Sequence, residues 1–119
     1  MEGKAFMTEK EFADLLGEKN ILEDDGESIL IRKNCAKMIH LFLQRKLHEK
    51  DEINIKKAEE IKDLFDCRIC ANHIAQVYLK GIMEIDKNMM LFNAYKEVSE
   101  KEATCYVLRT VDKSKRLLL

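Results

Sequence analysis

The sequence predicts a small all-α domain. Three observations favour this fold class: proline is absent from the 119 residues, only four glycines occur, and apolar residues recur at helical spacing in several segments. Proline and glycine disfavour helix interiors, whereas apolar side chains three and four positions apart share one helix face. The length fits a single domain over residues 1–119 with one modest core.

Two helices are predicted in the first half of the chain. The first follows a capping box, Thr8-Glu9-Lys10-Glu11, and ends at Gly17. An acidic stretch with the turn sequence Asp24-Asp25-Gly26 separates it from the longest predicted helix, from about Leu30 to Leu47. The first helix has Phe12, Leu15 and Leu16 on its apolar face, and the second has Ile31, Cys35, Met38, Ile39, Phe42 and Leu43.

The second half predicts a short helix, a regular helix, a long loop and a final helix. Asn54 is a candidate cap for the short helix, which includes Ala58 and Ile61. The regular helix covers Cys67 to Lys80 and ends at Gly81, and the loop follows over residues 82–98. A second capping box, Ser99-Glu100-Lys101-Glu102, opens the final helix, after which the tail 113–119 frays or docks. The expected inward faces are Ile69, Cys70, His73, Ile74, Val77 and Tyr78 in the regular helix, and Ala103, Tyr106, Val107 and Val111 in the final one.

Composition and motifs exclude several classes of function. The net charge of −1 and the few aromatic residues argue against a nucleic-acid partner. No apolar run approaches the ~20 residues of a membrane span. The first residues lack a secretory signal, which predicts a cytoplasmic protein as numbered, or a cell-surface protein if a signal was removed. Because nucleophile-elbow, P-loop, dinucleotide and His-Glu-x2-His motifs are all missing, we expect a non-enzymatic protein without a cofactor.

The four cysteines leave three alternatives. In a chain without a signal they are expected to be reduced thiols, most simply buried as small apolar residues. Cys67 and Cys70 also have the spacing of half a zinc site, which His73 could extend, with Cys35, His40 or Cys105 as a further ligand. A redox role is the third alternative.

The order helix, bend, polar loop, cap and helix occurs twice, in pseudo-repeats at about 8–47 and 54–111. In the second copy, Gly81-Ile82 ends a helix, Phe92 lies six residues before Val98, and the segment 98–102 forms the cap. In this order and spacing the chain resembles the S-layer homology (SLH) family over about residues 12–110. Asp63 stands at the position of the family's aromatic-x-Asp start, the pair Asp25-Gly26 looks like its loop turn, and Leu30-Ile31-Arg32 looks like its cap.

The chain also departs from the SLH pattern. Ile69 replaces the family's helix-start tryptophan, Glu100 replaces the cap arginine in the second copy, and two units are present where the family typically has three. These departures weaken the expected function more than the expected fold.

The resemblance implies a non-covalent binding module for an acidic cell-wall polysaccharide. Arg32 would supply the cation that grips a carboxylate, and Asp25, Gly26, Asp63 and Gly81 are the other candidate ligand-binding residues. Arg32 could instead be a solvated residue paired with a neighbouring acid. The alternative functions are a protein-interaction module that keeps the scaffold, with self-association into a homo-oligomer, and a small zinc-stabilised domain.

Overall fold

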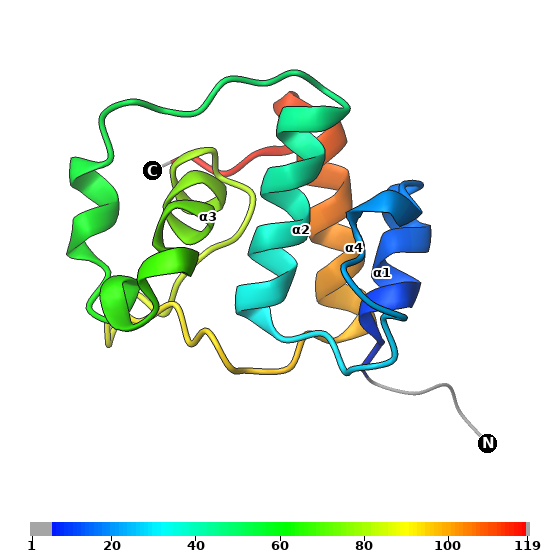
Figure 1. The fold of residues 1–119 in the computed structure, drawn as a ribbon. Helices are drawn as coiled ribbons and strands as arrows, with labels where there is room; N and C mark the ends of the chain where they lie inside the picture. Colours follow the sequence, from blue (N-terminus) through cyan, green and yellow to red (C-terminus); the bar gives the residue numbers. More distant parts are fainter. Residues whose placement is uncertain (1–5, 119) are drawn as a thin grey trace.

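The computed structural model describes residues 6–118, and in that range it consists of α-helices connected by loops and short 3-10 helices (Figure 1). Its regular secondary structure includes no sheet in this range, where the extended segments form isolated β-bridges. The predicted all-α fold class is therefore confirmed. The α-helices are α1 (Glu9–Leu16), α2 (Arg32–Arg45), α3 (Arg68–Leu79) and α4 (Glu100–Val111), and the 3-10 helices are η1 (Lys19–Ile21), η2 (Lys56–Glu60), η3 (Leu64–Asp66) and η4 (Lys113–Lys115).

Both predicted capping boxes are present. The Thr8 hydroxyl accepts from the Glu11 amide at 3.2 Å, and the Glu11 carboxylate accepts from the Thr8 amide at 2.8 Å. Ser99 and Glu102 make the same pair of bonds at 3.1 and 2.9 Å. These reciprocal bonds satisfy amides that a helix start leaves unpaired, which is why α1 and α4 begin where the sequence predicts.

The segments that precede α1, α2 and α4 lie together. The segment 29–32 is in the middle: the Leu30 amide donates to Met7 O at 2.8 Å, and Leu30 O accepts from the Val98 amide at 2.9 Å. Bridges pair Thr8 with Ile29 on one side and Ile31 with Glu97 on the other. The three helix starts are thus fastened to one another by backbone hydrogen bonds.

Helix α2 is the central element. It packs against α1, α3 and α4, and Figure 1 shows α3 on one side of it and α1 and α4 on the other. The largest fully buried apolar side chains come from every part of the fold and make one core: Phe12, Leu30, Ile39, Leu43, Ile61, Leu64, Ile74, Ile82, Met83, Phe92 and Tyr106.

Three predicted inward residues face solvent instead. Ile69 is 87% exposed, and Leu15 and Val111 are about half exposed. The packed face of α3 runs through Ala71 and Ala75, whose small side chains are buried. The buried face of α3 is therefore rotated about the helix axis relative to the predicted face, so that Ile69 lies outside it. The prediction considered mainly large apolar residues and so did not include these alanines.

The short helix predicted after Asn54 is η2, a 3-10 helix in which Ala58 is buried. The Asn54 side chain accepts from the Lys56 amide at 3.0 Å. The tail docks: the Leu117 amide donates to Gly81 O at 2.8 Å, while Leu119 lies outside the described residues. None of the described helices has the length and apolar character needed to cross a membrane.

Candidate binding groove

Arg32, the predicted ligand-binding cation, is buried. It is only 7% exposed, and its guanidinium donates to Phe92 O at 2.8 Å, to the Tyr106 hydroxyl at 2.7 Å and to Glu84 O. Its charged carbon also lies 4.4 Å from the centre of the Phe92 ring. These contacts make Arg32 an internal clamp on the loop between α3 and α4, and neither an exposed cation nor a solvated partner of Asp24 or Asp25.

Asp63 binds the same loop through its backbone amides. Its two carboxylate oxygens accept from the amides of Phe92 and Asn93, at 2.8 and 2.9 Å. Arg32 and Asp63 are thus brought together around Phe92, one on its carbonyl and one on its amide. Charge-assisted bonds of this kind fix the loop more firmly than neutral ones.

The remaining predicted site residues shape turns elsewhere in the fold. Asp25 accepts from the Glu27 amide at 3.1 Å, and Gly26 has φ +70° with its carbonyl accepting from the Lys10 amide at 2.9 Å. Gly81 has φ +73°, and a Cβ there would lie 2.1 Å from Leu117 O. Both glycines are needed for backbone conformation and close approach.

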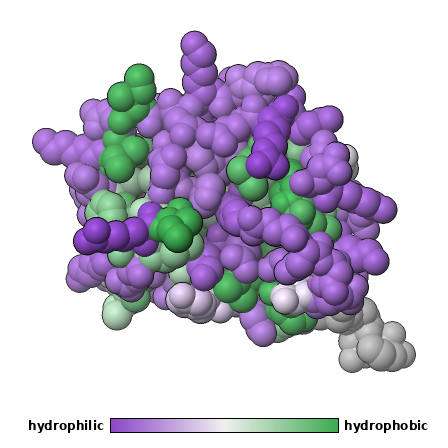
Figure 2. Space-filling view, viewed as in Figure 1, coloured by the Kyte–Doolittle hydropathy of each residue, from purple (hydrophilic) through white to green (hydrophobic). Residues whose placement is uncertain are grey.

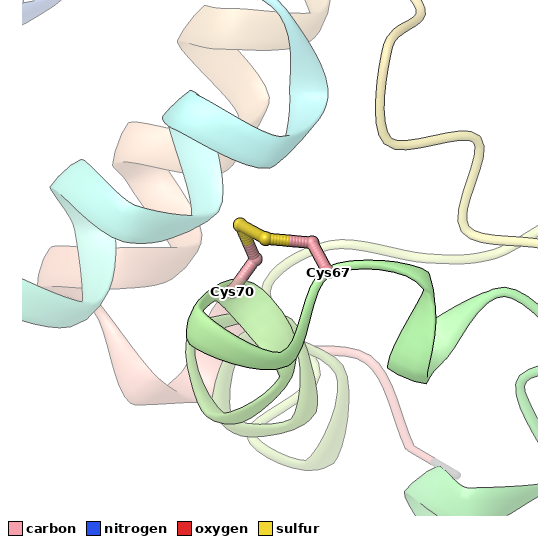
Figure 3. Close-up of a disulfide and its surroundings, with 2 residues drawn as sticks. All are labelled: Cys67 and Cys70. Carbon is pink, nitrogen blue, oxygen red and sulfur yellow. A yellow bond between two sulfur atoms is a disulfide. The ribbon is translucent and has the colours of Figure 1, made fainter.

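Cys67 and Cys70 form a disulfide at the start of α3 (Figure 3). The expectation of four reduced thiols is wrong for this pair, because Cys67 lies immediately before α3 and Cys70 in its first turn, where the two sulfur atoms meet. Cys35 is fully buried, which raises the pKa of its thiol well above the usual range, and Cys105 is exposed on α4. Within residues 6–118 no group of three His, Cys, Asp or Glu side chains is placed to hold a metal ion, so the predicted zinc ligands do not assemble there.

A groove of about 270 Å³ lies between the segment before α3 and the loop that Arg32 and Asp63 hold. Its polar lining includes Asp66 and Asn93, and its apolar lining includes Ile74 and Ala94. The complete lining is Asp63, Asp66, Cys67, Ile74, Asn93, Ala94, Tyr95 and Lys96.

Tyr95 and Lys96 line one side of this groove, and Lys33 contacts the Tyr95 ring. Tyr95 is 69% exposed, and the Lys33 ammonium lies 4.8 Å from the centre of its ring. The loop is tied to the start of α2, because the Arg32 amide donates to Lys96 O at 2.9 Å and the Lys33 amide to Ala94 O at 2.8 Å. These carbonyls cap α2, whose preceding residue, Ile31, has no side-chain oxygen to do so.

Sequence reasoning missed Tyr95, Lys96, Asn93 and Lys33. The sequence offered only a weak indication, which was a tyrosine next to a lysine within the predicted loop 82–98. What brings Lys33 to Tyr95 is the capping of α2 by the loop, a contact between segments about sixty positions apart.

A second polar cluster links α2, α3 and the loop after α2. His40 is almost fully buried, with one ring nitrogen 2.7 Å from Asp51 Oδ1 and the other 2.8 Å from His73 Nδ1. Burial and the neighbouring His40 lower the pKa of His73 to about 4. Burial raises the pKa of Asp51, but hydrogen bonds from His40 and Asn72 bring it below its usual value. The cluster fixes the loop 46–55 to the two helices.

Comparison of the chain with protein-family models, with curated proteins and with solved structures found no match. Function must therefore be inferred from the groove itself.

Proposed function

We propose that the protein is a non-enzymatic binding module and that the groove beside α3 takes an acidic glycan of the cell wall. The observation that supports this most is the exposed ring of Tyr95 at the edge of a groove lined by amide, carboxylate and ammonium groups. The SLH resemblance supplies the ligand class.

The chemistry of the lining suits a sugar chain. The face of an exposed tyrosine offers an apolar platform for the C–H face of a sugar ring. The Asn93 amide and the Asp66 carboxylate can bind hydroxyl groups, while Lys33 and Lys96 can pair with an acidic substituent. In this proposal the two lysines take the role that the SLH resemblance implies for Arg32.

The hydrogen bonds of Asp63 support binding without hydrolysis. A typical glycosidase needs two carboxyl groups free to act on either side of the glycosidic bond. Asp63 and Asp66 both line the groove, but both oxygens of Asp63 already accept from backbone amides. We therefore propose retention of the glycan and no cleavage.

The test is retention of the protein on purified, pyruvylated wall polysaccharide. We expect Tyr95→Ala to weaken binding at least tenfold, and the pair Lys33→Ala and Lys96→Ala to weaken it and reduce its dependence on salt. Lys57→Ala, an exposed lysine of η2 outside the groove, is the matched control and should bind like the wild type. Failure of the wild type to bind, or full binding by Tyr95→Ala, would contradict the proposal.

Exposed apolar side chains favour a protein-interaction module as the second candidate. Phe65 and Ile69 are 54% and 87% exposed near the start of α3, and Figure 2 shows apolar side chains on an otherwise hydrophilic surface. Sedimentation velocity at rising concentration tests self-association. A concentration-dependent dimer that Ile69→Asp abolishes would support this candidate, and a strict monomer would remove homo-oligomerisation.

A further inference from the structure

The Cys67–Cys70 disulfide is open to reagents on the groove side. Both cysteines are half-buried, and Cys67 is part of the groove lining. Cys67 is the residue immediately before α3, and Cys70 lies in the first turn of that helix (Figure 3). The exposed side chains of Phe65 and Ile69 lie close by in the sequence, one before and one after Cys67.

The bridge adds little to the fold. A disulfide stabilises mainly by restricting the unfolded chain, and the effect grows with the length of the loop that it closes. Here the two cysteines are only three positions apart, within a turn that α3 already defines. Fold stability therefore does not explain a disulfide at this place.

The N-terminus of α3 and Arg68 favour a thiolate at Cys67, and they act against Asp63 and Asp66, whose carboxylates line the same groove. Within the described residues, Cys67 makes no capping hydrogen bond through its side chain, and the first turn of α3 contains Arg68 but no acidic residue. By contrast, α1 and α4 each begin with a hydroxyl cap and two acidic residues. A Cys67 thiolate would supply both the missing cap and the missing negative charge, and such positions lower the pKa of a cysteine.

We propose that Cys67 and Cys70 form a thiol–disulfide exchange site that reacts with external thiols, with Cys67 as the exchanging sulfur. A thiolate from the external compound attacks Cys67 Sγ, the bridge breaks, and Cys70 leaves as a thiolate that takes up a proton. A second external thiolate then attacks the outer sulfur of the mixed disulfide and releases Cys67 as a thiolate. Two external thiols are thereby oxidised to one disulfide, and the bridge is reduced to two cysteine thiols.

The first experiment measures alkylation of the reduced wild-type protein by iodoacetamide, residue by residue, with mass spectrometry from pH 5 to 9. Cys105 is the internal control, because it is exposed but lies within α4 and away from the helix start. We expect Cys67 to react at least tenfold faster than Cys105 at pH 6, even though it is less exposed. Arg68→Glu should slow Cys67 several-fold and leave Cys105 unchanged.

The second experiment exposes Cys70→Ser and Cys67→Ser to oxidised glutathione, with circular dichroism to confirm the fold of each variant. A mixed disulfide that forms on Cys67 much faster than on Cys70 supports the assignment. Equal alkylation of Cys67 and Cys105 in the wild type, or faster capture by Cys70, would overturn it. These readouts do not involve a glycan, so the exchange site and the binding module can fail separately.

Discussion

The guanidinium of Arg32 lies between the loop that follows α3 and the helix α4. Its three hydrogen bonds end on Phe92 O, Glu84 O and the Tyr106 hydroxyl, so its removal leaves two buried acceptors and one part-buried acceptor without their donor. The Tyr106 side chain is also shielded from water, and this burial raises the pKa of its phenol to about 12. The energetic role of Arg32 is therefore structural.

Replacing Arg32 by Lys should lower the free energy of unfolding by about 3 kcal/mol, because one ammonium cannot reproduce a planar fork of donors. Urea unfolding followed by circular dichroism measures this. Arg45→Ala, an exposed position on the same helix, is the control and should change stability by less than about 0.5 kcal/mol. A small effect at Arg32 would show that the loop does not depend on it.

His73 makes the stability of the protein sensitive to mild acid. Its pKa of about 4 in the folded protein lies below the ordinary value of 6.5, so the unfolded chain binds the proton more tightly. The stability that neutral His73 contributes to the folded protein is complete above pH 6.5 and is lost as the pH falls to about 4. Because the His73 ring is only half-buried and is screened by water, we expect a loss of roughly 1–2 kcal/mol over this range.

Urea unfolding of the wild type and of His73→Gln at pH 7 and pH 5 tests this dependence. Gln cannot titrate, so the loss at pH 5 should shrink in the variant. His48→Gln removes an exposed histidine and should keep the wild-type dependence. Equal pH dependence in His73→Gln and the wild type would contradict the assignment.

At the scale of the elements, the helix ends depend on glycines in two different ways. Gly17 ends α1 with φ +81° and has open space where a Cβ would be, whereas Gly81 follows α3 with φ +73° and touches the backbone of Leu117. Substitutions at Gly17 and Gly81 therefore distinguish two costs in folding free energy. One is the cost of a positive φ for a residue with a Cβ, and the other is the cost of a steric clash with the tail.

Gly17→Ala should destabilise the protein by about 1 kcal/mol, which is the conformational penalty alone. Gly81→Ala should cost clearly more, because the tail must also move away from the new Cβ. Thermal unfolding of both variants tests the difference. Equal effects would mean that the tail contributes nothing at Gly81.

At the scale of the whole molecule, ion pairs between side chains connect the C-terminal tail to the loop after α2. Arg116 grips Glu49 through two bonds of 2.7 and 2.9 Å, and Lys80 lies 3.1 Å from the same carboxylate. Chiefly because of the hydrogen bond from Arg116, the pKa of Glu49 falls to about 2. Glu49 thus adds stability above pH 4.5 that is lost as the pH falls toward 2.

Arg116→Ala should cost about 2–3 kcal/mol, because it leaves the shielded Glu49 with Lys80 alone. Hydrogen exchange should rise in the loop 46–55 and in the tail together. Lys115→Ala, an exposed neighbour, is the control and should leave exchange unchanged. Increased exchange in the tail without the loop would show that the two are not coupled.

The structural features that depend on residues close together in the sequence were predicted correctly. The two capping boxes, the glycine bends and the apolar stripe of α2 each lie within a few positions, and each is present. The burial of Arg32 and the groove at Tyr95 depend on contacts between segments far apart in the chain, which no local pattern encodes. The disulfide was missed because a chain without a recognisable secretory signal was expected to keep its cysteines as reduced thiols.

The joined helix starts have a consequence for shortened forms of the protein. The backbone of Leu30 is bonded on both sides, by Met7 and by Val98. Deleting the chain up to Thr8 would remove the acceptor of the Leu30 amide. This extended segment would then have an unpaired edge that can form backbone hydrogen bonds with another molecule. Truncation there should therefore promote aggregation before it abolishes helix content.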